Sequence, residues 1–329
     1  MKAIKFFAIS AMAAAMITSC SSEDELSQSN YPSDNIVRVT AGVNNAKTRA
    51  EGAGTEMKKD FSLTIVNKNA PKYTYTDKVF SKSSGDWACS ETLLWQKSDA
   101  LVDIVAFAPA QTGKFNGVYA NGSIQPIAYS VASDQSTSSA NNDLLYYYAP
   151  GFNPGKSLVD KKLSIQFNHA FCMIDINVTL GTEFNKPEVL KESPIVKVTL
   201  GGTKIAANID VTNAASVVTA SETAAATDIT TTQGTFDKAA NAEANAISRF
   251  SCIAIPQKVE ANTFKVSLMT AGKRYEWTSA ESFELKSGYR YTLNLSMGND
   301  VVLLKGGSDN GGITATPWGP GTGGSLETE

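Results

Sequence analysis

Hydrophobic and polar residues alternate along much of the chain after residue 35, with the period of two that is typical of β-strands. The first such segment starts at Ile36, and its apolar positions are Val37, Val39, Ala41 and Val43. Because every second side chain of a strand points to the same face, this segment predicts a strand with one buried face. The same alternation predicts further strands over residues 61–65, 73–75, 196–200, 264–268, 275–277 and 289–297.

Two other segments depart from simple alternation. Residues 101–108 are almost entirely apolar and end at Pro109, which predicts a central strand that is buried on both faces. The Ala-rich stretch 214–247 is open to two interpretations, a helix or a long surface excursion, and its many Ser and Thr residues favour the excursion. Many short strands separated by Gly, Asn, Asp and Pro turns predict an all-β fold of the sandwich or barrel type.

The segment Leu163 to Leu180 changes its buried face halfway along. Apolar residues occupy odd positions up to Phe167 and even positions from Ile174 onward. A regular strand cannot switch faces, so a bulge or crossover is expected between these two residues, around His169. We place a domain boundary near residue 160, because the preceding residues 150–162 have the Gly, Pro, Lys and Asp content of a linker. This predicts an N-terminal sandwich over residues 36–160 and a C-terminal sandwich over residues 161–329.

The first nineteen residues have the pattern of an export signal. Lys2 and Lys5 precede an apolar stretch that is too short to span a bilayer. The following Ile17-Thr18-Ser19-Cys20 resembles a bacterial lipobox, which predicts acylation of Cys20 and removal of residues 1–19. An ordinary signal peptide with a nearby thiol is the alternative. No later segment is apolar enough to span a membrane, so lipid would be the anchor.

A polar tether follows at residues 20–35 and contains the acidic run Glu23-Asp24-Glu25. This composition is typical of a solvated linker. It also resembles the acidic stretch that sends some bacterial lipoproteins to the cell surface. Both interpretations stay open, with surface export favoured.

Composition excludes several kinds of chemistry. The 329 residues are 42% hydrophobic and only 19% charged, and the formal net charge is −3, so the basic surface that nucleic-acid binding needs is missing. The single histidine, His169, is interpreted as a structural residue whose ring bonds a backbone group near the bulge. With no catalytic motif, no C-x-x-C pair and no metal-ligand spacing, we expect neither an enzyme nor a cofactor or metal site.

Three cysteines remain if Cys20 carries lipid. Cys89, Cys172 and Cys252 allow one disulfide and one free thiol in an oxidising compartment. Cys172 lies within an apolar strand pattern, which favours a buried free thiol at that position.

Several short motifs, in order after the lipobox, resemble the fimbrillin family of type V pilus subunits, in particular its Mfa-like branch. They are the Val-rich first strand, Thr48-Arg49-Ala50, Phe61, Ala106-Phe107-Ala108-Pro109, Asp143-Leu144-Leu145-Tyr146, Phe167-Asn168-His169-Ala170 and the closing Ile313 to Trp318 with its Gly-rich tail. The resemblance implies two tandem transthyretin-like antiparallel β-sandwich domains. It also implies a stalk or tip subunit of a surface fimbrium that supports adhesion.

The resemblance further implies how the subunits assemble. In this family an arginine-specific protease cuts after an arginine that follows the first strand, and Arg49, followed by Ala50, occupies that position here. The cut would release the chain up to Arg49, including the strand with Val37, Val39, Ala41 and Val43. A strand from another subunit would then fill the vacated site by β-augmentation. The alternative is that Arg49 is an ordinary loop arginine.

The donor strand is expected near the C-terminus. The candidate residues are Val301 and Leu303 in one apolar run and Ile313 and Trp318 in the next. Glycine pairs between the runs interrupt the alternation that a long donor strand needs, which favours a hinge there. The last strand would then either swing out to a neighbour or close its own sheet.

The expected partners are other pilus subunits, an arginine-specific protease and outer-membrane lipid through Cys20; a host or glycan ligand is a further candidate. The expected location is the cell surface, as an outer-membrane lipoprotein and in the fimbrium. The alternative function is a glycan-binding β-sandwich lipoprotein that does not polymerise. Aromatic side chains that could stack on sugar rings are Tyr146, Tyr147, Tyr148 and Trp318, although most are expected to be core or strand residues.

Overall fold

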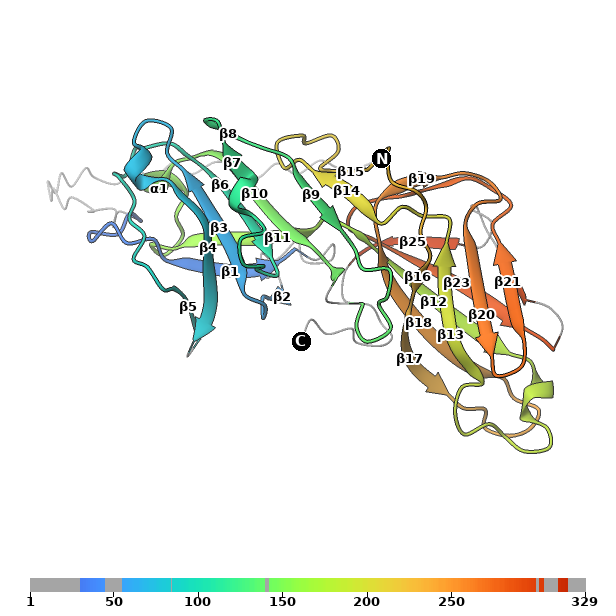
Figure 1. The fold of residues 1–329 in the computed structure, drawn as a ribbon. Coiled ribbons are helices and arrows are strands. Elements are labelled where there is room, and N and C mark those ends of the chain that lie inside the picture. The colour runs from blue at the N-terminus through green and yellow to red at the C-terminus, as the bar shows by residue number, and fades with distance from the viewer. Residues whose placement is uncertain are drawn as a thin grey trace, which may run out of the picture.

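The computed structural model describes residues 30–44, 55–83, 85–139, 142–299, 302–304 and 313–318. Figure 1 shows an elongated molecule in which two groups of strands lie one after the other along the long axis. The described residues form strands almost throughout, so the all-β prediction is confirmed. The only α-helix among them is the single turn α1 (Pro154–Ser157), and short 3₁₀ turns cover Pro71–Tyr73, Asn116–Val118 and Thr182–Asn185.

The first group is an eight-stranded sheet that contains most of the N-terminal half of the chain. Its spatial order is β2-β1-β11-β10-β6-β3-β4-β5. The bounds are β1 (Val39–Val43), β2 (Thr55–Glu56), β3 (Phe61–Val66), β4 (Tyr75–Ser83), β5 (Asp86–Cys89), β6 (Val102–Ala108), β10 (Leu145–Phe152) and β11 (Leu163–His169). Tyr73 lies in a 3₁₀ turn, so the strand that was expected to start there begins at Tyr75.

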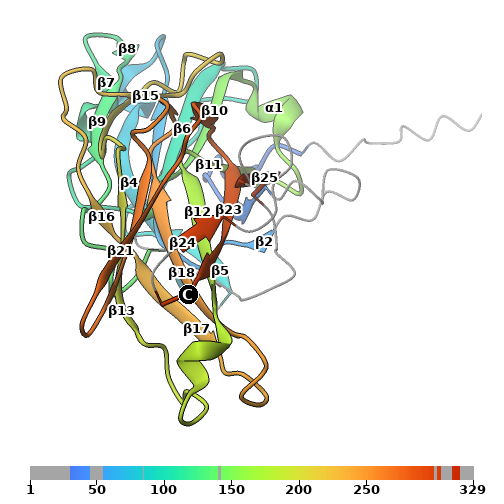
Figure 2. The same cartoon turned by 90° about the vertical axis from the view of Figure 1, so that its right-hand side faces the viewer.

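The second group is a sandwich of two sheets in the C-terminal half, which Figure 2 shows from its end. One sheet has the order β17-β18-β12-β23-β24, with β25 also pairing with β23, and the other has the order β16-β13-β20-β21. The bounds are β12 (Cys172–Leu180), β13 (Ile195–Gly201), β16 (Ile229–Thr230), β17 (Thr232–Asp237), β18 (Ala246–Ala254), β20 (Lys265–Thr270), β21 (Arg274–Thr278), β23 (Tyr289–Met297), β24 (Val302–Leu304) and β25 (Ile313–Pro317).

One of the smaller sheets connects the two groups. Strand β9 (Ile127–Ser130) comes from the N-terminal half but pairs with β14 (Ala206–Ile209), which in turn pairs with β15 (Val218–Ala220). The remaining pairs are β7 (Tyr119–Ala120) with β8 (Ser123–Ile124) and β19 (Gln257–Val259) with β22 (Phe283–Leu285). The Ala-rich stretch 214–247 holds β15, β16, β17 and the start of β18 and no helix, because its Ser and Thr residues suit short strands and turns.

Two hydrophobic cores follow from these sheets. The N-terminal core contains Phe61, Ile104, Phe167 and the valines of β1, whereas the shared core joins Phe107 and Phe115 to the interior of the C-terminal sandwich. Strand β6 serves both cores, because its alternate side chains enter different cores. This explains why residues 102–108 are apolar almost without interruption, and it confirms the prediction of a central strand.

The expected change of face lies where the chain crosses between the two groups. Strand β11 pairs with β1 and β10, whereas β12 pairs with β18 and β23, so the chain changes sheets at Ala170 and Phe171. The crossover predicted between Phe167 and Ile174 is therefore confirmed. It falls about ten residues after the boundary proposed at residue 160, since β11 remains part of the first sheet. Most strand pairs are antiparallel, as expected, but the pairs β1–β11 and β12–β23 are parallel.

Candidate subunit-assembly site

Strand β1 lies near one end of the eight-stranded order and pairs chiefly with β11. The parallel register runs from Val39 opposite Leu163 to Val43 opposite Phe167. On its other side β1 pairs with the two-residue strand β2 only at Gly42 and Val43. The backbone contacts continue beyond the strand, because Asn44 N donates to Phe167 O at 2.7 Å and Val37 N donates to Leu93 O at 2.9 Å.

Three valines of this segment enter the N-terminal core. The side chains of Val37, Val39 and Val43 are 4–6% exposed, while Ala41 is half-buried and Thr40 is exposed. This is the one-face pattern that the sequence predicts, with Ala41 as its weakest member. Burial of a valine side chain is worth roughly 1.5–3 kcal/mol, so the three valines hold the segment to the sheet firmly.

Strand β11 depends on β1 more than on its other neighbour. It pairs with β1 over five residues, but it pairs with β10 only through His169 opposite Leu145 and Asn168 opposite Tyr146. The inward-facing residues of β11, Leu163, Ile165 and Phe167, are completely buried. Without β1, most of the β11 backbone edge and the apolar residues beside it would lose their cover.

An ion pair fixes the start of the first strand. Arg38 Nη2 lies 2.6 Å from Asp34 Oδ2, and both side chains are about half exposed. The hydrogen bond from Arg38, assisted by the backbone N–H of Ile36, holds the pKa of the Asp34 carboxyl well below its usual range. Because exposed pairs contribute little to stability, the valines rather than this pair hold the segment in place.

The C-terminal candidates cover one edge of β23. Strand β25 pairs with its first half, from Ile313 opposite Leu293 to Pro317 opposite Tyr289, and β24 pairs with its second half, from Leu304 opposite Leu295 to Val302 opposite Met297. The two short strands thus form one edge strand in two pieces. Ile313 is buried, whereas the next four residues of β25 are exposed.

Trp318 ties the end of β25 to the crossover between the sheets. Its ring stacks on the His169 ring with centroids 3.9 Å apart and planes 7° apart, and its backbone N donates to Gly288 O at 2.7 Å. His169 Nδ1 lies 2.9 Å from Asp143 Oδ2, and both side chains are at least nine-tenths buried. The expectation that the histidine bonds a backbone group is therefore wrong, because the partner is a carboxylate.

The His169–Asp143 pair has the first two members of a hydrolase relay, but no hydrogen bond among the described residues joins His169 to a hydroxyl or thiol nucleophile. The flat face of His169 is covered by Trp318, which is a structural use of the ring. Within the described ranges no group of three or more His, Cys, Asp or Glu side chains could hold a metal ion.

The described cysteines are all free thiols. Cys172 and Cys252 are buried on neighbouring strands, and Cys89 is half-buried. Burial raises the pKa of both the Cys172 and the Cys252 thiol well above the ordinary value, so neither is a reactive thiolate. The prediction of a buried free thiol at Cys172 is confirmed.

Several predicted site residues lie outside the described residues: Cys20, Arg49, Ala50 and Val301. The structure places Val39, Ala41 and Val43 on β1 beside β11, with Val37 just before the strand and bonded to Leu93. It places Leu303, Ile313 and Trp318 along the β23 edge and its end. Tyr146, Tyr147 and Tyr148 lie on β10 and pack in part against the two cores, as the strand interpretation expected.

Sequence reasoning missed Asp143 as the partner of His169 and Trp318 as its cover. Both residues belong to motifs that were noted, but a contact between positions 26 residues apart leaves no spacing signal. It also missed that β11 is the main partner of β1, since a parallel pair joins residues far apart in the chain.

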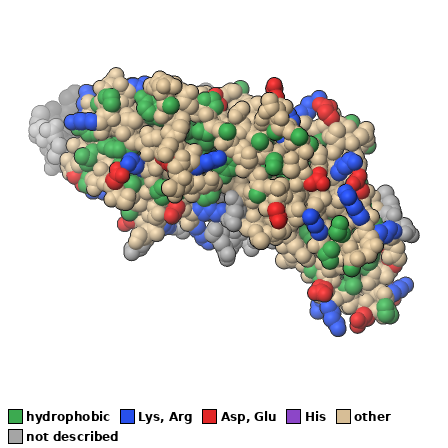
Figure 3. Space-filling model, in the orientation of Figure 1, with side chains coloured by type: hydrophobic (Ala, Val, Ile, Leu, Met, Phe, Trp, Pro, Cys, Tyr) green, Lys and Arg blue, Asp and Glu red, His purple; other side chains and the backbone are tan. Residues whose placement is uncertain are grey.

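The surface carries charges of both signs. On the face shown in Figure 3, Lys and Arg side chains are interspersed with Asp and Glu. In the part of the chain that the structure describes, no helix is long and apolar enough to cross a membrane.

Comparisons with known proteins place this geometry in a family. Among solved structures, the chain resembles a candidate cell adhesion protein from Bacteroides ovatus ATCC 8483, with a TM-score of 0.60, 16% identity, and coverage of 86% of this chain and 97% of that chain. A candidate cell adhesion protein from Bacteroides uniformis ATCC 8492 gives a TM-score of 0.56 at 15% identity, covering 87% and 99%. A fimbrial protein from Bacteroides vulgatus ATCC 8482 gives 0.51 at 13% identity, covering 86% and 99%.

These TM-scores show a shared fold, and the low sequence identities show nothing beyond it. The search of curated proteins gave no match. The Fimbrillin-like family profile matches residues 48–318, which is most of the chain and spans both sheet groups. The chain therefore belongs to the fimbrillin-like family.

Proposed function

We propose that this protein is a structural subunit of a cell-surface pilus, exported as a lipoprotein through Cys20 and assembled by strand exchange after cleavage between Arg49 and Ala50. Family membership supports the pilus role. The arrangement of β1 supports the mechanism: it pairs with β11 over five residues, it and the adjoining Val37 bury three valines, and among the described residues its other strand partner is the two-residue β2. This is the observation that carries the proposal.

Cleavage after Arg49 would change the competition for the β11 edge. In the intact chain β1 is an intramolecular partner, so its effective concentration at β11 is high and a strand from another chain competes poorly. After the cut, the segment up to Arg49 is a separate peptide that can diffuse away. A neighbour's strand with apolar residues at alternate positions could then pair with β11 and cover Leu163, Ile165 and Phe167.

The donor is proposed to come from the C-terminal segments. Strand β24 has apolar residues at every position, and β25 carries Ile313 and Ala315 on alternate positions. Strands β24 and β25 are short and each pairs with only part of β23. Release of either one would therefore break fewer backbone pairs than removal of a long central strand. The stalk and tip positions in a pilus both agree with this arrangement.

The test is an assembly assay on the purified chain without its signal peptide. Treatment with an arginine-specific protease should produce a new N-terminus at Ala50, seen by mass spectrometry, together with multimers in size-exclusion chromatography. R49A should abolish both results, and K47A, which removes a neighbouring basic residue, should leave both intact. A chain that is cut at Ala50 and stays monomeric would exclude strand exchange, and assembly of uncut R49A would exclude cleavage as the trigger.

Export is tested separately on whole cells. Mass spectrometry of surface protein should find lipid on Cys20 in uncut chains, and C20A should remain unacylated and fail to reach the surface. Unchanged surface display of C20A would contradict the lipoprotein route. The non-polymerising alternative is distinguished in the same cells, because it requires only acylated, uncut chains and no multimers.

A further inference from the structure

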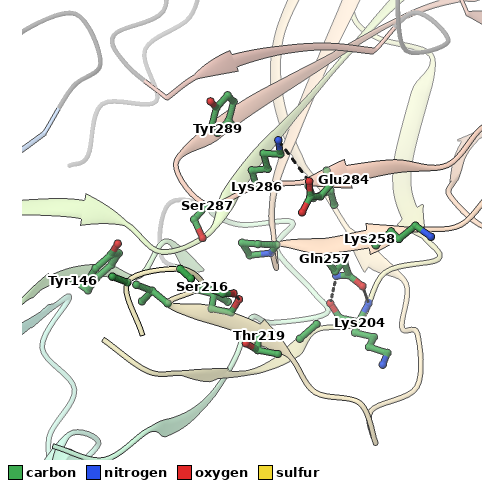
Figure 4. Close-up of a pocket in the computed structure, with 17 residues that line it drawn as sticks. Tyr146, Lys204, Ser216, Thr219, Gln257, Lys258, Glu284, Lys286, Ser287 and Tyr289 are labelled. Carbon is green, nitrogen blue, oxygen red and sulfur yellow. Dashed lines mark hydrogen bonds and ion pairs between the residues drawn. The ribbon is translucent and has the colours of Figure 1, made fainter. Parts of the chain in front are cut away.

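A pocket of about 760 Å³ lies where the two sheet groups meet. Its walls come from separate elements, as Figure 4 shows: Tyr146 from β10, the chain around Ser216 that leads into β15, Gln257 from β19, Ser287 from the β22–β23 connection and Tyr289 from the start of β23. The volume is within the range of roughly 300–1,000 Å³ that small-molecule sites occupy. We propose that this pocket binds an acidic carbohydrate, a sugar segment that carries a carboxylate.

The charges around the pocket favour an anionic ligand. Three lysines line it, Lys204, Lys258 and Lys286, against one acidic residue, Glu284. Glu284 already lies 3.5 Å from Lys286, and Lys258 lies 2.9 Å from Glu260 outside the pocket. The side chains of both ion pairs are more than half exposed, so a ligand carboxylate could take the place of Glu284 or Glu260 beside the lysine at little cost in free energy.

Lys204 lies at the rim of the pocket, and Figure 4 shows its side chain turned away from the tyrosines, so it would have to rotate to reach a ligand. Its Nζ donates to the Glu222 backbone carbonyl at 3.2 Å, and no carboxylate pairs with it among the described residues. Its backbone is fixed independently, because Lys204 N donates to Gln257 Oε1 at 2.9 Å and Gln257 Nε2 donates to Lys204 O at 3.0 Å. A fixed backbone and an ammonium without a carboxylate partner suit a charge-assisted bond to an incoming carboxylate.

The rest of the lining matches a polyhydroxylated ligand. Figure 4 shows Tyr146 on one side of the pocket, Tyr289 beside Lys286 at its top, and Lys204 and Lys258 on the side opposite Tyr146. Both tyrosines pack partly against the shared core, and each combines an apolar ring with a polar hydroxyl. Ser216 and Ser287 also line the pocket, and a hydroxyl can both donate to and accept from a sugar hydroxyl.

An extended peptide fits the same pocket less well. Asp210 N donates to Val217 O and Ser221 N donates to Ala206 O, so the alternate residues Val218 and Ala220 direct their backbone groups away from β14, toward the open edge. However, Ser216 Oγ already donates to Val218 O at 3.0 Å, and β15 is only three residues long. An added peptide strand would find a short and partly occupied edge, whereas a sugar does not need that edge.

The experiment is isothermal titration calorimetry with the full mature chain. The probes are tetragalacturonate and 3′-sialyllactose as acidic sugars, maltotetraose as a neutral sugar, and tetraglutamate as an acidic peptide. At least one acidic sugar should bind saturably and maltotetraose at least tenfold more weakly. K204Q should weaken binding about tenfold or more, while K156Q, an exposed lysine on α1 far along the chain, should not change it.

A second variant tests whether binding depends on the tyrosine ring as well as on the charge of Lys204. Y289A should also weaken binding of the acidic sugar, with circular dichroism confirming that it is folded. Absence of saturation with both acidic sugars at millimolar concentration would overturn the proposal, as would equal binding of tetraglutamate or of maltotetraose. None of these results depends on cleavage at Arg49, so the site and the assembly mechanism can fail separately.

Discussion

The first and last strands of the described chain lie at or next to a sheet edge, but they are held in different ways. Strand β1, together with Val37 just before it, places three valines in the N-terminal core and pairs in parallel with β11. Strand β25 pairs antiparallel with β23 over an equal length, yet only Ile313 is buried and Trp318 holds its end by stacking on His169. Strand β1 is therefore part of a hydrophobic core, whereas most of β25 lies on the surface beside one.

This difference affects which strand would need a cut in the chain for its release under the proposed assembly mechanism. Burial of three valines is worth roughly 5–9 kcal/mol, so spontaneous opening of β1 would be rare. Strand β25 would give up one buried side chain and one aromatic stack, so its opening is expected to be much more frequent. On the proposed assembly mechanism, a protease would therefore be needed to release the N-terminal strand but not the C-terminal one.

The strongest test of the comparison removes the core residue that β1 covers. Phe167 is completely buried opposite Val43 and contacts the Phe61 ring at a centroid distance of 5.5 Å. F167A should lower the free energy of unfolding by about 3–5 kcal/mol, because a large cavity would remain. Urea denaturation measures this, with S164A on the same strand as the control. A loss similar to that of S164A would show that the β1–β11 contact is not part of a tight core.

A smaller change addresses β1 itself. V39A removes two methyl groups from a side chain that is 4% exposed, and should lower the free energy of unfolding by about 2 kcal/mol. The neighbouring exposed Thr40 provides the matched control, since T40A should stay within about 0.5 kcal/mol of the natural protein. Equal effects of the two substitutions in urea denaturation would mean that β1 is held by its backbone alone.

The corresponding change at the other end is W318A. Loss of the stack on His169 should cost on the order of 1–2 kcal/mol, and it should act locally on β25 rather than on global unfolding. Hydrogen exchange of the Thr314 and Thr316 amides, which lie opposite Thr292 and Arg290, should then become about tenfold faster. T316A, an exposed position on the same strand, is the control. Unchanged exchange in W318A would show that the pairing with β23, not the stack, holds β25.

The smallest effect is expected at the ion pair before β1. R38Q should raise the pKa of Asp34 toward its usual value near 3.9, because the main cause of its lowered pKa is the hydrogen bond from Arg38. A lowered pKa adds stability above the unfolded-state value, and that stability is lost as pH falls below it, so any difference belongs to acid pH. NMR titration follows the carboxyl, with Asp134 as an internal control. A pKa of Asp34 that does not move would assign the shift to the Ile36 amide instead.

Much of the local structure could be predicted from the sequence because strands leave a local signal. The alternation at Val37, Val39 and Val43 predicted the buried face of β1, and the unbroken apolar run of residues 102–108 predicted a strand with two buried faces. The shift from odd to even positions after Phe167 located the crossover to within a few residues. The motif order predicted the family as well. For the strands and the crossover, the information lies within a few neighbouring residues, where the pleat of a strand fixes which side chains share a face.

The partners of those strands were decided only by the tertiary structure. The sequence pattern does not predict that β1 pairs with β11, that Trp318 stacks on His169 or that this histidine contacts Asp143. Nor does it predict that Tyr146, Lys204 and Tyr289 line one pocket. Such contacts join residues that are distant in the chain, and they depend on the register and crossing of whole sheets rather than on local pattern. Alternation determined which side chains are buried, and the packing of one sheet group against the other determined what each of them meets.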